Sequence, residues 1–372
     1  MNNLKPTLTA QDIVLHICAD FMFPVTNQSG VESLALSRDA GSVGAIQSMV
    51  QVHDFVEQNA KFEQPAVKFE TTIYGRRWLG YSRAGENLYP ILLSPTPFCP
   101  LPRQQLSKAI SLWQEVLPEI LGPHALFLGD PFRSMNDQGV TEAELVIALA
   151  SRLAEGASQK AHELAREERK KDAQRLYMAR TKLLSHLLAQ HSGVFGIGVE
   201  LMYREDCAET IREKDAAEHI QGLIEALQED SWFGHSIGYF WTRNFISEAG
   251  YRTTLFLLFD THTMPISKID GTEILQQWVE YTKGAGRGFN RYGSICQIDE
   301  VLRYVECSKL AAQYLRLKPN AKYPPFGMSP LPFRQSLSAT KKESVTNLRD
   351  GGGFGWPQTE ESGLNLNNRF SK

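Results

Sequence analysis

The residues best suited to chemistry lie in one stretch near the C-terminal end, between Tyr281 and Lys342. This stretch holds eleven lysines and arginines against three acidic residues, a net charge of +8 in a chain whose formal charge is −3. Aromatic residues are interleaved with the cations. Basic groups that follow phosphates, beside rings on which bases stack, are typical of a surface that binds single-stranded nucleic acid. The sequence predicts nucleic-acid contacts from Lys283, Arg287, Arg291, Arg316 and Lys322.

A glycine-rich run opens this stretch. Gly284, Gly286 and Gly288 alternate with other residues beside Lys283 and Arg287. Glycines let backbone amides approach a phosphate closely, so the run predicts phosphate contact. A solvated loop is the alternative. The spacing is not that of a P-loop, which argues against nucleotide hydrolysis.

The elements that must position these residues follow a readable order between residues 190 and 320. Alternating and apolar segments predict strand, helix, strand, strand, helix, short strand and helix. The predicted ranges are 194–203, 208–228, 236–245, 251–259, 269–281, 291–298 and 299–317. This order predicts an α+β domain with the split βαβ, ferredoxin-like plan, an antiparallel sheet with helices on one face. The plan alone specifies no function.

The rest of the chain divides into three further parts. Residues 1–140 read as a mixed α/β region without a catalytic motif. It has a helix at 42–62, a hairpin from strands at 67–74 and 78–81, a third strand at 87–93 and a helix at 104–121. Residues 141–184 read as a long charged helix that begins with a capping box at Thr141 and serves as a spacer. The domain of interest spans 185–330, and the polar, glycine-rich residues 335–372 predict a disordered tail.

The cysteine content and the lack of long apolar runs indicate the cellular compartment. The five cysteines are odd in number and form no C-x-x-C pair, which favours a reducing compartment over a disulfide framework. No segment approaches the roughly 18 uninterrupted apolar residues of a membrane span. The sequence therefore predicts a cytoplasmic protein without a membrane partner.

Four stretches of the C-terminal region also carry a family resemblance. They are GVELMYRED, GYRTTLFLLFD, WVEYTKGAGRGFNRYGS and KLAAQYLRLKPNAKYPPFGMS, in this order from Gly198 to Ser329. Together they resemble the C-terminal domain of the inovirus-type replication proteins, also described as the YagK/YfjJ C-terminal domain. That family occurs in filamentous phages, prophages and integrated mobile elements. It is distantly similar to HUH-type rolling-circle replication initiators.

The resemblance implies a chemistry for two residues. HUH enzymes pair a strand that carries two metal-binding histidines with a helix that carries a nucleophilic tyrosine. The metal polarises the scissile phosphate, and the tyrosine becomes a 5′-phosphotyrosine. Tyr314 occupies the nucleophile position, and Lys318, one helical turn further on, is the expected phosphate ligand. A tyrosine packed on the sheet beside a solvated lysine is the alternative.

The histidine positions depart from the family pattern. Arg252 and Thr254 stand there, and arginine has no lone pair to offer a metal. A guanidinium can instead grip a phosphate bidentately, which predicts a DNA contact from Arg252. If nicking is retained, Mg²⁺ or Mn²⁺ would need a mixed site from His262, Asp260 and Glu200.

These observations favour a replication-initiator-like protein of a phage or mobile element that binds single-stranded or origin DNA through a degenerate HUH site. An active, metal-assisted nicking–joining endonuclease with a tyrosine nucleophile is the first alternative. The second alternative is a non-catalytic interaction protein that keeps only the fold.

Overall fold

The computed structural model describes most of the chain up to residue 329. The described ranges are 8–26, 32–38, 41–60, 67–71, 73–75, 77–82, 86, 88–93, 103–122, 132–136, 138–229, 235–264, 271–290, 295–318 and 320–329. Arg291 and the predicted tail at 335–372 lie outside these residues. None of the helices in the described ranges has an apolar stretch long enough for a membrane span.

The N-terminal half is mainly helical, with two small hairpins. Its elements are α1 (Ala10–Asp20), β1 (Met22–Thr26), β2 (Glu32–Leu36), α2 (Val43–Asn59), β3 (Val67–Thr71), β4 (Arg77–Tyr81), α4 (Leu88–Leu93), β5 (Gln104–Leu106) and α5 (Lys108–Leu121). The predicted helix at 42–62 and the β3–β4 hairpin are confirmed. The predicted strand at 87–93 is wrong. Leu88, Ile91 and Leu92 are spaced to bury one side of a helical turn, and all three join a core shared by α2, α5 and α6.

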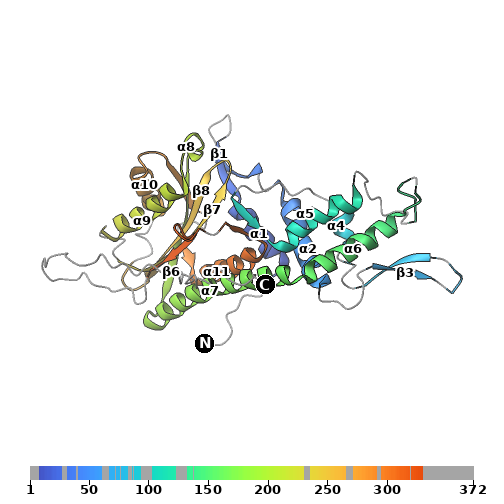
Figure 1. Cartoon of the computed structure of the whole chain (residues 1–372). Coiled ribbons are helices and arrows are strands. Elements are labelled where there is room, and N and C mark those ends of the chain that lie inside the picture. Colours follow the sequence, from blue (N-terminus) through green and yellow to red (C-terminus); the bar gives the residue numbers. More distant parts are fainter. Residues whose placement is uncertain are drawn as a thin grey trace, which may run out of the picture.

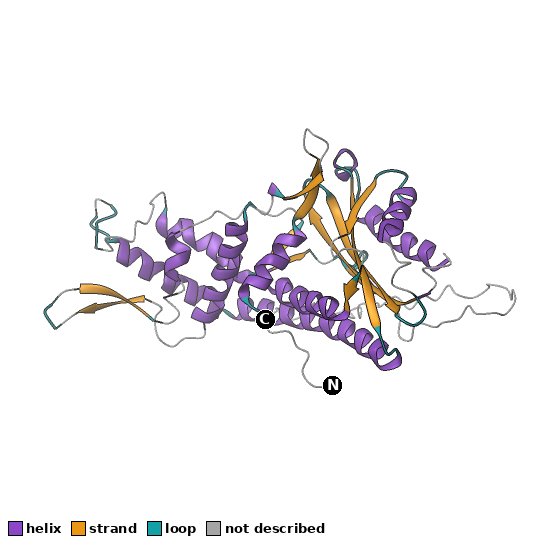
Figure 2. Ribbon diagram, turned by 180° about the vertical axis from the view of Figure 1, so that it is seen from behind, coloured by secondary structure: helices purple, strands orange, loops and turns teal. Residues whose placement is uncertain are grey.

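Two consecutive helices connect this core to the C-terminal sheet. The helix α6 (Glu142–Ser158) begins with the predicted capping box, in which Thr141 accepts from the Glu144 amide and Glu144 accepts from the Thr141 amide. Gln159 is extended and separates α6 from α7 (Lys160–Gln190). Seen from behind in Figure 2, α7 runs from the helical part to the sheet.

The charged run of α7 also makes buried contacts. The Arg169 side chain is buried and donates to the backbone carbonyls of Gln105, Leu106 and Ala312. The helix is thereby fastened to β5 and to the last helix of the fold. A solvated spacer would make no such contacts.

The C-terminal region is built on one antiparallel sheet. Its strands are β6 (Val194–Tyr203), β7 (Ser236–Ile246), β8 (Gly250–Asp260), β9 (Gly286–Asn290), β10 (Cys296–Gln297) and β12 (Phe326–Met328). The order is β10-β6-β8-β7-β12, and β9 pairs with β6 alongside β10. Every residue of β6 and β8 is buried, because helices cover both faces of the sheet.

The helices divide between these two faces (Figure 1). The helices α9 (Glu213–Glu229) and α10 (Gly271–Tyr281) cover one face, and α8 (Glu205–Ala208) is a short turn before α9. The opposite face is covered by α7 and by α11 (Ile298–Tyr314). The expectation of helices on one face only is therefore wrong. Leu183, Leu184 and Leu187 form an apolar stripe at the end of α7 that packs on the sheet.

The last helix ends earlier than predicted. At Tyr314 it passes directly into β11 (Leu315–Leu317), which pairs with β5 from the N-terminal half. The helix α1 also packs on α11, where Ile17 and Cys18 share a core with Ala311 and Tyr314. The two halves of the chain are thus joined by a small sheet and by helix packing.

Candidate functional site

The position where the resembled enzymes carry their metal-binding histidines holds a buried ion pair. Arg252 on β8 donates through Nε to Glu200 on β6 at 2.8 Å, and Thr254 Oγ1 donates to the two Glu200 oxygens at 3.0 and 2.9 Å. Glu200 is opposite Thr254 in the β6–β8 register, so one face of the sheet presents all three side chains. The Arg252 residue is 2% exposed and Glu200 0%.

The N-terminal segment closes this position from outside. The Arg252 Nη1 group donates to the carbonyl oxygen of Met22 on β1, and the guanidinium lies 5.6 Å from the centre of the Phe289 ring. At the nearby turn between β7 and β8, Glu248 accepts from the Ser37 hydroxyl at 2.6 Å and from the Arg38 amide at 2.7 Å. In this arrangement, Arg252 faces protein groups and not a solvent-accessible phosphate site.

The three predicted metal ligands are not brought together. Asp260 pairs in register with Val194, six residues before Glu200 on β6, which separates the two carboxylates by roughly 20 Å along the strand. Within the described ranges, no group of three or more histidine, cysteine or acidic residues is arranged to hold a metal ion.

Asp260 and His262 do meet, together with His191, which the sequence did not single out. His191 Nδ1 lies 2.7 Å from Asp260 Oδ2, and the His262 amide donates to Asp260 Oδ1 at 2.9 Å. Desolvation raises the pKa of Asp260, but the hydrogen bonds from His262 and His191 together lower it by more. The net shift of the Asp260 pKa is therefore downward. The cluster holds an ionised carboxylate at the end of the sheet.

Tyr314 is withdrawn from solvent. Its hydroxyl donates to Asp54 Oδ1 on α2 at 3.2 Å, and its ring meets the His53 ring edge-on at 4.6 Å between centroids. Burial, and then the neighbouring Asp54 carboxylate, raise the pKa of Tyr314 above its usual value. Burial also raises the pKa of Asp54. A tyrosine in this setting resists conversion to the phenolate that attacks phosphorus.

His53 completes the polar cluster beneath Tyr314. Its Nδ1 lies 2.8 Å from the Ser107 hydroxyl, which also caps α5. Burial, reinforced by the positive charge of Arg169, lowers the pKa of His53 to about 3. The ring is therefore neutral at physiological pH.

Tyr314 and Lys318 do not share a helical face. The expectation of one helical turn between them is wrong, because α11 ends at Tyr314 and the next three residues form β11. Four extended residues separate their Cα atoms by roughly 13 Å. Lys318 is exposed and lies apart from the Tyr314 hydroxyl.

The glycines of the predicted phosphate loop have packing roles. Lys283 and Gly284 adopt positive φ angles of 55° and 84° and end α10, where the Gly284 amide donates to the Val279 carbonyl at 2.8 Å. A Cβ atom on Gly288 would lie 2.6 Å from the Glu200 carbonyl oxygen. The close pairing of β9 with β6 therefore requires glycine. Lys283 is exposed and Arg287 is half-buried.

Several cations of the basic stretch are engaged within the protein. Arg316 Nη1 donates to Asp172 on α7 at 2.9 Å, and its Nε donates to Gln105 at 3.0 Å. Lys322 is exposed, and its ammonium lies 5.4 Å from the centre of the Tyr323 ring. The charge excess of the sequence is thus offset in part by internal ion pairs.

No sequence pattern indicated which residues would contact Tyr314 in the fold. Asp54 and His53 lie some 260 residues from Tyr314, and no spacing pattern links them.

No protein-family model, no curated protein and no solved structure matches this chain.

Proposed function

We propose that this chain is a replication-initiator-like protein of a phage or integrated mobile element that holds single-stranded or origin DNA without cutting it. The family resemblance of residues 198–329 and the +8 charge between residues 281 and 342 support the DNA part of the proposal. A cytoplasmic location follows from that role.

The strand order supports a ferredoxin-like domain. Taken along the chain, β6, β7, β8 and the β9–β10 pair are the four strands of the plan, and the sheet order places the fourth beside the first. The helix α9 connects the first strand to the second, and α10 connects the third to the fourth. In this reading, α7, α11 and β12 are additions to the plan.

The ion pair between Arg252 and Glu200 is the observation that supports the absence of DNA cleavage in this proposal. A metal-assisted nuclease needs ligands with free lone pairs near the scissile phosphate. At this position an arginine offers none, and the Glu200 carboxylate already accepts hydrogen bonds from Arg252 and Thr254. The chemistry of the residues present does not fit Mg²⁺ or Mn²⁺.

Exposed cations remain for electrostatic contact with DNA. Lys283, Lys318 and Lys322 are exposed, and Lys322 lies beside an aromatic ring. Such groups bind a phosphate backbone by releasing counterions, which makes affinity fall steeply as salt rises.

The test is a titration of the full-length chain with a labelled single-stranded oligonucleotide over a series of salt concentrations, followed by fluorescence anisotropy. The proposal expects binding whose logarithmic affinity falls linearly with the logarithm of salt concentration. Absence of binding at low salt would refute it and would favour the non-catalytic interaction protein.

A nicking–joining endonuclease is the second candidate. The family resemblance favours it, because Tyr314 occupies the nucleophile position. Asp54, which accepts the hydrogen bond of the Tyr314 hydroxyl, would have to take up its proton during attack. This candidate requires a covalent protein–DNA adduct that Tyr314→Phe abolishes.

A further inference from the structure

An open pocket of about 380 Å³ lies where the two halves of the chain meet, and none of the predicted catalytic or metal residues except Lys318 contributes to it. Four of its six lining residues are charged, and three of those are cations. The lining residues are Arg103, Arg212, Glu213, Tyr251, Leu317 and Lys318.

Backbone pairing fixes two of the cations side by side. The Lys318 amide donates to the Arg103 carbonyl at 2.9 Å, which extends the β5–β11 pairing by one step. Arg103 has a φ of 58°, a left-handed conformation that is uncommon for a residue with a side chain and is often found at functional sites. A residue from the N-terminal half and one from beyond α11 therefore meet at the same wall of the pocket.

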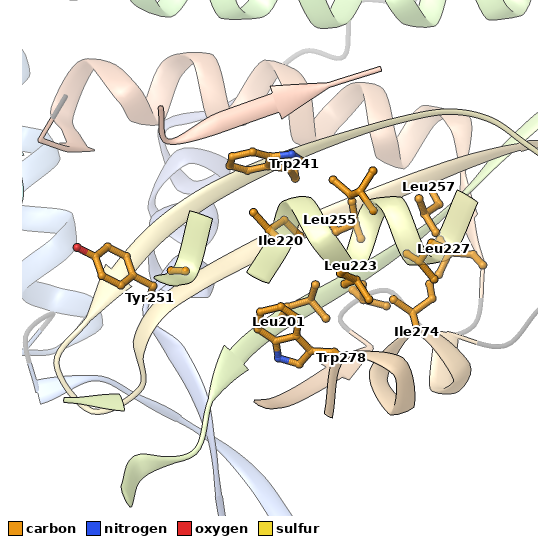
Figure 3. Close-up of a cluster of buried hydrophobic side chains, with 14 of the residues drawn as sticks. Leu201, Ile220, Leu223, Leu227, Trp241, Tyr251, Leu255, Leu257, Ile274 and Trp278 are labelled. Atoms are coloured by element: carbon orange, nitrogen blue, oxygen red, sulfur yellow. The ribbon is translucent and has the colours of Figure 1, made fainter. Parts of the chain in front are cut away.

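Aromatic rings orient the Arg103 side chain. Its guanidinium lies 4.6 Å from the centre of the Phe245 ring and 5.1 Å from that of Tyr251, and its Nη1 donates to the Tyr251 hydroxyl at 2.5 Å. The Tyr251 hydroxyl points away from the other labelled side chains of the sheet core in Figure 3. Stacking on rings leaves the other donors of a guanidinium available to an anion.

The acidic groups at the pocket are already paired. Glu213 accepts from Asn320 at 2.7 Å and from Arg243 at 3.4 Å. Asp215 accepts from the guanidinium of Arg212 at 3.0 and 3.1 Å. Lys318 has no acidic partner in the described part of the chain.

A buried cation adds to the positive charge behind the pocket. The Arg243 side chain is 0% exposed, and its guanidinium lies 5.5 Å from the centre of the Tyr251 ring. Its Nε and Nη1 atoms are buried without a hydrogen-bond partner among the described residues. Four cations thus lie in and around the pocket with three carboxylates, Glu213, Asp215 and Glu218, so the positive charges outnumber the negative ones among the described residues.

We propose that this pocket binds the phosphate group of a nucleotide or of a nucleic-acid strand. Arg103 and Lys318 supply charge-assisted hydrogen bonds to the phosphate oxygens. Tyr251 and Leu317 form an apolar wall for the attached sugar or base. The strand form of this ligand rests on the proposed DNA binding, whereas the free-nucleotide form does not.

Isothermal titration of the full-length chain with deoxyadenosine monophosphate, with deoxyadenosine and with a single-stranded oligonucleotide tests the pocket. The variants are Lys318→Ala and Arg103→Gly, because glycine tolerates the positive φ of position 103. Lys318→Arg is the conservative variant, and Lys182→Ala removes an exposed lysine of α7 as a matched control. We expect the monophosphate but not the nucleoside to bind, an affinity about tenfold weaker in the first two variants, and wild-type affinity in the control.

The outcomes separate this proposal from DNA binding itself. Monophosphate binding that Lys318→Ala weakens supports the pocket even if the oligonucleotide does not bind. Oligonucleotide binding that Lys318→Ala and Arg103→Gly weaken alike supports the strand form. If neither variant changes the affinity for either ligand, or if the nucleoside binds as well as the monophosphate, the pocket is not a phosphate site.

Discussion

The Arg252 guanidinium and the Glu200 carboxylate meet at 2.8 Å inside the sheet, on neighbouring strands whose side chains are withdrawn from water. An ion pair this deeply buried loses the hydration of both charges, so each member depends on the other. The pair fills the position where an enzyme of the resembled type would hold a metal. Its presence is the structural basis for proposing that the chain binds DNA without cleaving it.

Removing one member of this pair is expected to destabilise the fold strongly. In Glu200→Gln, the side chain keeps its shape but leaves the Arg252 charge buried and uncompensated, at a cost of about 3–5 kcal/mol in the free energy of unfolding. Urea denaturation measures this change. Arg204→Ala, which breaks the exposed pair with Asp206, is the control and should leave the midpoint unchanged. An equal, small effect in both variants would contradict the buried pairing.

Stability should depend on the protonation of His53. Its pKa in the folded state, about 3, lies below the ordinary 6.5, so the unfolded chain takes up the proton first as pH falls. Stability is therefore lost between about pH 6.5 and pH 3, with a slope that approaches ~1.4 kcal/mol per pH unit. Comparing urea unfolding of wild type and His53→Gln across this range isolates the histidine. Identical slopes in the two proteins would rule out the neutral, buried ring.

Gly288→Ala should loosen the edge of the sheet. A Cβ atom there would lie 2.6 Å from the Glu200 carbonyl oxygen and 2.7 Å from Leu275 Cδ2, and the backbone oxygen cannot move aside freely. Overpacking of this kind typically costs about 1–3 kcal/mol. Thermal unfolding measures the loss. The control is Gly44→Ala, where only the end of the Ser42 side chain lies within 4 Å of the added atom. Gly139→Ala is unsuitable as a control, because the φ of 79° at that position strains any residue with a side chain. Unchanged stability in Gly288→Ala would mean that the glycine run is free of this packing constraint.

Arg316 and Lys318 should differ in their effect on DNA affinity, although they are two residues apart. The Arg316 charge is already paired with Asp172, whereas Lys318 is exposed and has no such partner among the described residues. Anisotropy titrations should therefore show a larger loss of affinity and a larger drop in salt dependence for Lys318→Ala than for Arg316→Ala. The reverse order would show that the Asp172 pair opens on binding.

The long strands of the C-terminal sheet could be predicted closely from sequence, but the short ones could not. The strand β9 lies in a stretch predicted as a phosphate-binding loop, and of the strand predicted at 291–298 only Cys296–Gln297 is a strand among the described residues. The strand at Val194–Tyr203 agrees with the prediction at both ends, because an apolar, alternating run is bounded by polar and glycine residues. The hairpin of β7 and β8 is equally well marked, since Gly250 supplies the positive φ of 66° with which β8 begins. Local pattern sufficed wherever the strand itself supplied the buried surface.

Tertiary pairing decided the features that the sequence could not give. Leu315 and Leu317 alternate with Arg316, which is the pattern of a strand, but their partner is a three-residue strand more than 200 residues away. The Arg252–Glu200 pair appears only once β6 and β8 are in register. The phosphate pocket draws on four separated segments, so its cations show no common spacing.

DNA binding without cleavage is tested most directly by incubating the full-length chain with labelled single-stranded DNA and Mn²⁺ and resolving the products on both native and denaturing gels. We expect a shifted complex on the native gel that weakens as salt rises, and no covalent protein–DNA species on the denaturing gel. A covalent species that Tyr314→Phe abolishes would contradict binding without cleavage and would establish the nicking–joining enzyme instead.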